Sequence, residues 1–140
     1  MFMEKSLAII KPDAVARNLS GDIISMILDR DIQIVAMKMR HLTVEEAKGF
    51  YIVHQDRPFY NDLVEFMSSG PVITMVLAGE NVIQSYRGLM GATNPKDAEP
   101  NTIRGKYAFS IDHNCVHGSD AEDTAQFEIE YLFDNEDLCL

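Results

Sequence analysis

The chain has 140 residues, of which 46% are hydrophobic, so we expect one folded domain over residues 1–140 and no second domain of normal size. The formal net charge of −10 argues against a nucleic-acid backbone as the main partner, although a small anion can bind where a site is locally basic. Two cysteines, no signal peptide and no apolar run long enough to span a bilayer lead us to expect a cytoplasmic protein without a membrane partner.

The first half of the chain predicts two strands and three helices from its hydrophobic periodicity. They are a strand at 6–10 that ends at Lys11-Pro12, a helix at 21–30, a strand at 33–40, a helix from the capping box of Thr43 and Glu46 towards residue 53, and a helix at 61–67.

The second half predicts two strands and two helices around one long loop. They are a strand at 72–78, a helix from Asn81 to about residue 90, a turn-rich loop at 91–101, a strand at 111–116, and a last helix opened by a capping box of Ser119 and Glu122. A loop of this length in a compact domain is usually functional. The whole order predicts an α+β, ferredoxin-like βαββαβ sandwich, with helices over an antiparallel sheet and a long loop before the last strand.

The sequence has neither of the glycine-rich turns that cradle phosphates, so side chains would have to hold any phosphate ligand. It also lacks the nucleophile elbow of serine hydrolases and the paired-histidine motif of zinc proteases. Three cations, Lys11, Arg87 and Arg104, could bracket one polyphosphate, since arginine pairs well with phosphate oxygens. Taken singly, each of them is also typical of a solvated surface charge.

His117 is the candidate for chemistry because it lies where a strand meets a capped helix. Gly118 removes side-chain bulk beside it, and the start of a helix favours an anion. A neutral imidazole is a nucleophile near physiological pH and can accept and pass on a phosphoryl group. This segment alone leaves an ordinary turn histidine open. A Cys115–His117 nucleophile pair and a histidine phosphatase fit less well, because Cys115 has apolar neighbours and Val116 stands where a phosphatase has arginine.

Several segments, in order and at family-like separations, together make the chain resemble nucleoside diphosphate kinase from about residue 4 to residue 136. They are Ile9-Ile10-Lys11-Pro12-Asp13-Ala14-Val15, Arg57-Pro58-Phe59-Tyr60, Ser69-Gly70-Pro71, Met90-Gly91-Ala92-Thr93-Asn94-Pro95, Thr102-Ile103-Arg104, and Asn114-Cys115-Val116-His117-Gly118-Ser119-Asp120.

The resemblance implies a ping-pong reaction in which a nucleoside triphosphate, mainly ATP, gives its γ-phosphoryl group to His117, and a nucleoside diphosphate then takes it. Broad tolerance of base and sugar would let the enzyme balance cellular NTP and dNTP pools. The implied roles are: Lys11 on the phosphate and sugar hydroxyls, Tyr51 beside the histidine pocket, Phe59 stacked on the base, Arg87, Thr93 and Arg104 on the phosphates, Asn114 on the ribose 3′-hydroxyl, Glu128 on the His117 imidazole, and Ser119 in support of that pair.

The resemblance also implies Mg²⁺, held mainly by the nucleotide phosphates rather than by protein ligands, and a homo-oligomer, for which a tetramer is favoured over a hexamer. Asn101 stands where the family generally has glycine, and residues 105–107 also depart from its pattern, so loop and subunit packing could differ. Two other functions stay open: a catalytically idle nucleotide-binding module, and an interaction protein that uses its acidic C-terminal part. The sequence does not tell which ring nitrogen of His117 reacts.

Overall fold

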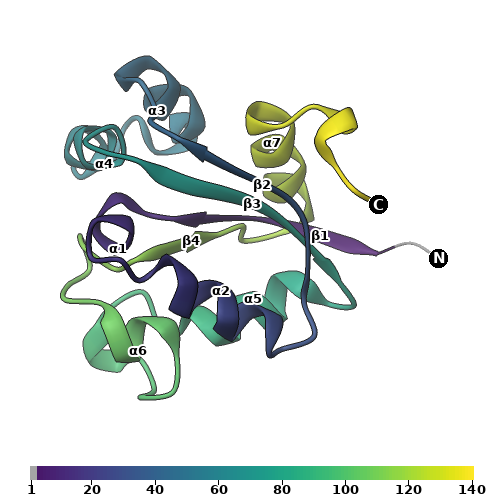
Figure 1. The fold of residues 1–140 in the computed structure, drawn as a ribbon. Coiled ribbons are helices and arrows are strands. Elements are labelled where there is room, and N and C mark those ends of the chain that lie inside the picture. Colours follow the sequence, from purple (N-terminus) through teal and green to yellow (C-terminus); the bar gives the residue numbers. More distant parts are fainter. Residues whose placement is uncertain (1–2) are drawn as a thin grey trace.

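The computed structural model describes residues 3–140, which form one four-stranded sheet flanked by helices (Figure 1). The strands are β1 (Glu4–Ile10), β2 (Gln33–Arg40), β3 (Val72–Gly79) and β4 (Val116–Gly118), in the spatial order β2-β3-β1-β4. Every neighbouring pair is antiparallel. This arrangement confirms the predicted ferredoxin-like plan, in which β1 lies between β3 and β4.

Seven α-helices and three short 3-10 helices occur within residues 3–140. They are α1 (Pro12–Ala16), α2 (Ser20–Leu28), α3 (Val44–Phe50), η1 (Ile52–His54), α4 (Tyr60–Met67), α5 (Val82–Met90), η2 (Pro95–Asp97), α6 (Ile103–Tyr107), α7 (Glu122–Leu132) and η3 (Asn135–Asp137). None of these helices is long and apolar enough to cross a membrane.

Helices cover both faces of the sheet, as Figure 1 shows. Helices α1, α2, α5 and α6 contribute to the core on one face, and α3, α4 and α7 contribute to the core on the other. In β1, Ala8 and Ile10 belong to the first core, whereas Leu7 and Ile9 belong to the second, and all four are fully buried. Burial on both faces explains why residues 7–10 of β1 are continuously apolar rather than alternating.

The sequence located β2 and the start of α3 well. The strand has the predicted bounds, 33–40. At α3, Thr43 Oγ1 accepts the Glu46 N–H at 3.0 Å, and Glu46 Oε1 accepts the Thr43 N–H at 2.9 Å, so the predicted capping box is confirmed. Asn81 does precede α5 as predicted, but its backbone is left-handed and its side chain makes no cap.

The predicted strand at 111–116 is wrong, because β4 begins only at Val116 and ends at Gly118. Cys115 has a left-handed φ of 75°, and its N–H donates to Asp13 Oδ2 at 3.1 Å. An extended strand cannot pass through that turn. Ile111, expected inside the strand, is exposed.

The predicted capping box of Ser119 and Glu122 is also wrong. Helix α7 begins at Glu122 after Ala121, whose N–H donates to Thr124 Oγ1 at 3.0 Å. Ser119 instead turns inward and is fully buried. Helices α1 and α6, of five residues each, were not predicted; Thr102 Oγ1 caps α6 by accepting the Gly105 N–H at 3.1 Å.

Candidate active site

A cavity of about 680 Å³ lies where β4 meets α5, α7 and the loop at 91–102. Nine of the ten residues proposed from the sequence line it: Lys11, Tyr51, Phe59, Arg87, Thr93, Arg104, Asn114, His117 and Glu128. The tenth, Ser119, lies behind Glu128 and hydrogen-bonds to it. The fold therefore brings together side chains from widely separated parts of the sequence.

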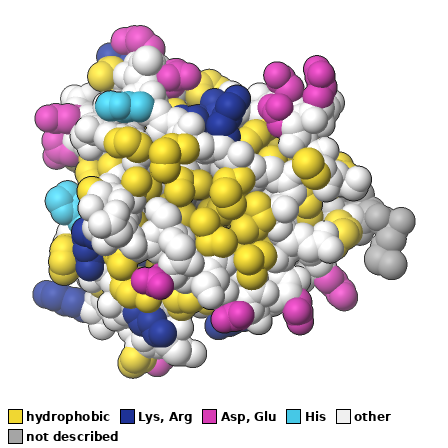
Figure 2. All heavy atoms as spheres, in the orientation of Figure 1, with side chains coloured by type: hydrophobic (Ala, Val, Ile, Leu, Met, Phe, Trp, Pro, Cys, Tyr) yellow, Lys and Arg dark blue, Asp and Glu magenta, His cyan; other side chains and the backbone are white. Residues whose placement is uncertain are grey.

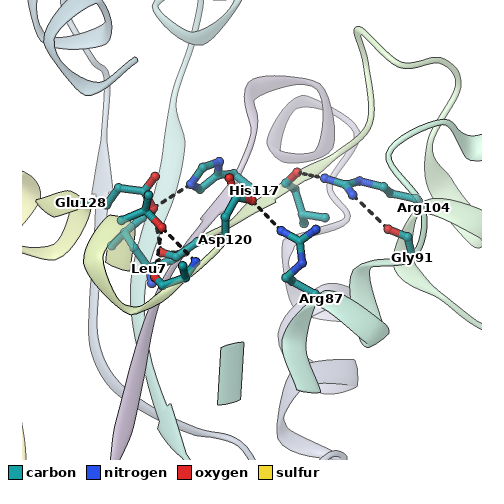
Figure 3. Close-up of polar contacts among 11 residues, drawn as sticks. Leu7, Arg87, Gly91, Arg104, His117, Asp120 and Glu128 are labelled. Atoms are coloured by element: carbon teal, nitrogen blue, oxygen red, sulfur yellow. Dashed lines mark hydrogen bonds and ion pairs between the residues drawn. The ribbon is translucent and has the colours of Figure 1, made fainter. Parts of the chain in front are cut away.

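His117 is held on β4, where its backbone pairs with Ile9 of β1. Its ring Nε2 lies 3.0 Å from Glu128 Oε1, and the Ser119 hydroxyl donates to the same oxygen at 2.7 Å. Ser119 Oγ in turn accepts the Leu7 N–H at 3.0 Å. This chain of contacts runs from β1 through Ser119 and Glu128 to the imidazole. Figure 3 labels Leu7, Glu128 and His117 along it.

The chemistry of these groups assigns the tautomer of His117. An ionised carboxylate only accepts hydrogen bonds, so Nε2 carries the proton that points to Glu128. The other ring nitrogen, Nδ1, then keeps its lone pair. Within the described residues, no side chain or backbone group hydrogen-bonds to Nδ1. The side chains of His117 and Glu128 are only 17% and 13% exposed, so little water competes for their contact.

Two aromatic rings pack edge-on against the imidazole. The Phe50 ring centroid lies 5.3 Å from that of His117, and the Tyr51 centroid lies 6.1 Å away. Burial and the nearby negative charge of Glu128 raise the pKa of the Tyr51 phenol, so the hydroxyl stays protonated. This hydroxyl has no partner among the described residues. Tyr51 therefore offers a hydrogen-bond donor beside His117, and Phe50 restricts the tilt of the imidazole ring.

Gly118 is required for packing as well as for access. A Cβ at this position would lie 2.7 Å from Met90 Cε and 2.8 Å from a Tyr86 ring carbon. The absent side chain thus lets β4 lie directly on α5, which sets how deep His117 sits. From the sequence, Gly118 was expected only to let a ligand approach the imidazole.

Lys11 and Arg104 are buried cations that bind neutral protein groups. Lys11 Nζ donates to Asn114 Oδ1 at 2.9 Å, and burial together with the charge of Arg104 lowers the pKa of Lys11 to about 8. The Arg104 guanidinium donates to the carbonyls of Gly91 at 3.0 Å, Val116 at 2.8 Å and Asn114 at 3.4 Å. Lys11 therefore carries its proton mainly below about pH 8, where both side chains bring positive charge to the cavity, and Arg104 also ties the long loop to β4.

The remaining predicted residues lie on the cavity wall. The backbone carbonyl of Thr93 accepts a hydrogen bond from the Asn114 side-chain amide, with 3.4 Å between Nδ2 and the oxygen. Phe59 is 47% exposed, with its ring centroid 5.6 Å from that of His54. Arg87 reaches across from α5 and donates to Asp120 at 2.5 Å, as Figure 3 shows.

Phe50, His54 and Asp120 are among the residues that line the cavity but were given no role from the sequence. Asp120 could have been found, since it belongs to the segment around His117. His54 was expected to be a surface or structural residue; it lines the cavity with its ring stacked on Tyr51 at 6.5 Å. Phe50 looks like any core aromatic in the sequence, and nothing in its spacing marks it.

Within residues 3–140, no cluster of three or more histidine, cysteine, aspartate or glutamate side chains could hold a metal ion. The cavity is lined by the single carboxylates of Asp97, Glu99, Asp120 and Glu128, of which Asp120 is paired with Arg87. This donor set fits a divalent ion that arrives on a polyphosphate better than an ion held in an all-protein cage.

The family model for nucleoside diphosphate kinase matches residues 4–138. A nucleoside diphosphate kinase of Nitrosococcus oceani is 55% identical over 139 residues, which are 99% of this chain and 97% of the relative. One of Francisella tularensis subsp. novicida is 56% identical over 138 residues, which are 99% of both chains.

Solved structures agree with this match. The Aquifex aeolicus nucleoside diphosphate kinase superposes with a TM-score of 0.95 at 39% identity, over 98% of this chain and 99% of that one. A halophilic nucleoside diphosphate kinase from Halobacterium salinarum, solved in complex with CDP, gives 0.94 at 40% identity, over 98% and 91% of the two chains.

Proposed function

The chain belongs to the nucleoside diphosphate kinase family, enzymes that transfer phosphoryl groups between nucleotides, and from this premise we propose that His117 is the phosphoryl carrier. In the first step the Nδ1 lone pair attacks the γ-phosphorus of a nucleoside triphosphate, mainly ATP. The new N–P bond forms as the bond to the β-phosphate oxygen breaks, and that oxygen leaves with the electron pair on the diphosphate. In the second step a nucleoside diphosphate attacks the phosphorus, and the electron pair returns to Nδ1.

The observation that carries this proposal is the contact between Nε2 of His117 and Glu128. Attack through Nδ1 places positive charge on the ring, and a carboxylate 3.0 Å from Nε2 stabilises that charge. Ser119 donates to the same carboxylate and fixes its orientation. Glu128 and Ser119 are thus proposed to orient and polarise His117, while Nδ1 performs the chemistry.

The cations of the cavity support a polyphosphate substrate. Lys11, Arg87 and Arg104 together balance the charge that a triphosphate brings and stabilise the phosphoryl group as it moves. Thr93 is assigned to the same phosphates. In the substrate, Mg²⁺ would neutralise part of the phosphate charge, and we propose that the nucleotide phosphates, rather than protein ligands, hold it.

Phe59 and Asn114 are proposed to hold the nucleoside. A half-exposed ring at the cavity wall can stack on any base, because stacking reads only the π-face, and this supports breadth rather than choice of base. Asn114 is fixed by Lys11 on its amide oxygen, and its amide nitrogen, which contacts the Thr93 carbonyl at 3.4 Å, has a second hydrogen that can donate to a sugar hydroxyl. The CDP complex of the Halobacterium salinarum relative supports a nucleoside diphosphate as ligand.

We also propose that the chain forms a homo-oligomer, with a tetramer favoured over a hexamer. Strand β2 is an edge of the sheet, and Met37 and Met39 on it are 49% and 61% exposed. Figure 2 shows hydrophobic side chains gathered across the middle of the face where β2 and β3 are drawn. Exposed apolar edges of this kind are usually covered in an assembly. A cytoplasmic location and a role in balancing NTP and dNTP pools stay predictions.

Labelling with γ-labelled ATP and Mg²⁺ tests the proposal. We expect an acid-labile, base-stable phosphoprotein, and we expect His117→Ala to remove the label while nucleotide binding persists. His113→Ala is the matched control, because His113 packs on Phe66 outside the cavity. A folded chain that takes no label would support the alternative of an idle nucleotide-binding module, and full labelling of His117→Ala would mean that another residue is the nucleophile.

A further inference from the structure

Asp120 places a carboxylate inside the phosphate-binding part of the cavity. It follows Ser119 in the turn between β4 and α7 and lies three residues after His117. Its Oδ1 lies 2.5 Å from Nη1 of Arg87 on α5, and both residues line the cavity. Figure 3 shows the two side chains meeting beside His117. A carboxylate at this place opposes the binding of any anion, so its presence needs a reason.

The three cavity cations differ in their partners. Lys11 binds an amide oxygen and Arg104 binds backbone carbonyls, so neither is hydrogen-bonded to a carboxylate that a phosphate would have to displace. The contact between Arg87 and Asp120 is the one ion pair that these three cations make to Asp or Glu in the part of the chain described here. A phosphate oxygen that binds Arg87 must therefore compete with a carboxylate oxygen of similar charge and geometry.

We propose that Asp120 is a specificity-determining residue of this site, whose carboxylate competes with phosphates for Arg87 and so disfavours small anions relative to polyphosphates. The inference rests on the proposed function, because it assigns Arg87 to the substrate phosphates. A di- or triphosphate contacts Lys11 and Arg104 as well, and its nucleoside adds contacts with Phe59 and Asn114. Orthophosphate makes few contacts besides Arg87, so losing part of that contact to Asp120 removes a larger fraction of its binding free energy than of a nucleotide's.

The size of the effect is limited by exposure. The Arg87 and Asp120 side chains are 44% and 75% exposed, so solvent screens their attraction. Exposed ion pairs of this type change equilibria by roughly two- to fivefold when one partner is removed. This is enough to matter for a site that must bind nucleotides in the presence of free inorganic phosphate, which would otherwise occupy the position in front of His117.

Asp120→Asn tests the proposal, since it keeps the size of the side chain and removes its charge. Glu122→Gln is the matched control, because it removes an exposed carboxylate two residues further along and outside this cavity. The dissociation constant of inorganic phosphate is measured by calorimetry, and that of ADP with Mg²⁺ in the same way. We expect phosphate to bind two- to fivefold tighter to Asp120→Asn, ADP to change less, and Glu122→Gln to match the parent chain.

A double variant separates this explanation from a general change in charge. In an Arg87→Ala background, Asp120→Asn should no longer improve phosphate binding, because the guanidinium for which Asp120 and phosphate compete is gone. Unchanged or weaker phosphate binding in Asp120→Asn overturns the proposal, and so does an equal gain with and without Arg87. A weaker affinity for the magnesium complex of ADP also overturns it, because Asp120 would then assist the substrate. Calorimetry needs no turnover, so a chain that binds phosphate in this way yet takes no label would contradict the proposed function alone.

Discussion

Replacing Glu128 by glutamine removes one negative charge beside His117 and leaves the shape of the side chain unchanged. The amide oxygen can still accept the Nε2–H, but it cannot balance the positive charge that the imidazole gains when Nδ1 attacks phosphorus. Hydrogen bonds to charged groups contribute about 1.5–3 kcal/mol, about twice as much as neutral ones. Both side chains are largely buried, so solvent does little to replace the lost charge.

The loss falls on the transition state, because the charge on the ring develops during phosphoryl transfer. Glutamine keeps the neutral hydrogen bond, so the loss is the difference between a charged and a neutral bond, about 1–1.5 kcal/mol. At about 1.4 kcal/mol per tenfold, we expect single-turnover phosphorylation by ATP to slow by roughly 5- to 12-fold. Glu128 is not assigned to nucleotide contacts, so the dissociation constant of ADP should change by less than about twofold. Rapid-quench measurement of phosphoenzyme formation gives the first quantity, and calorimetry gives the second.

Glu130→Gln is the matched control, because Glu130 is an exposed carboxylate on the same helix, α7. This variant should form phosphoenzyme at the parent rate. The reasoning is refuted if Glu128→Gln forms phosphoenzyme within twofold of the parent rate. It is equally refuted if the entire loss appears as weaker nucleotide binding, because the carboxylate would then act on the ground state.

Three further predictions concern the residues around the site. Burial lowers the pKa of Lys11 to about 8, so kcat/KM should fall as pH rises through about 8 and the ammonium loses its proton. Lys11→Arg should remove this fall, because arginine keeps its charge at these pH values. The same fall in Lys11→Arg would contradict the assignment. Gly91→Ala should cost at least about 1–3 kcal/mol in urea unfolding, because φ is +87° and ψ is 178° and the new Cβ would lie 2.8 Å from Thr102 Cβ. Asp13→Ala should cost about 1–3 kcal/mol in the same assay and raise KM, because the Cys115 N–H loses its carboxylate acceptor in a left-handed turn beside Asn114.

Local patterns in the sequence were enough wherever one element is stabilised by its own residues. Strand β2 matched its predicted bounds, although burial does not alternate along it, since Val35 and Ala36 are both buried and Met37 and Met39 are both exposed. Helix α3 began as predicted because Thr43 and Glu46 cap each other. The strand at β1 was found because burial on both faces leaves its residues 7–10 continuously apolar, whereas its first residues, Glu4 and Lys5, were not predicted.

Prediction failed where a distant residue changes the local preference. The stretch at 111–116 has the composition of a strand, but the Asp13 carboxylate stabilises a left-handed turn at Cys115 and shifts β4 to Val116. Ser119 and Glu122 have the spacing of a capping box, but the Ser119 hydroxyl binds Glu128 instead. Neither partner can be identified from short-range spacing.

In the candidate site, too, residue types could be predicted from the sequence, but contacts between distant residues could not. Its residue types could be chosen from the sequence by resemblance, and nine of the ten line one cavity. The reacting nitrogen of His117 could not be chosen, since that depends on which ring nitrogen Glu128 contacts. The pairing of Arg87 with Asp120 was missed because it joins two elements whose separation in space no sequence pattern gives.

The central claim is that His117 carries the phosphoryl group between two nucleotides. The most direct test is to isolate the phosphorylated chain free of ATP, add a nucleoside diphosphate with Mg²⁺, and measure the transfer. We predict that every labelled chain discharges and yields one labelled nucleoside triphosphate, with the label on Nδ1 of His117 beforehand. A phosphorylated chain that releases only inorganic phosphate, or that carries the label on another residue, would contradict the account.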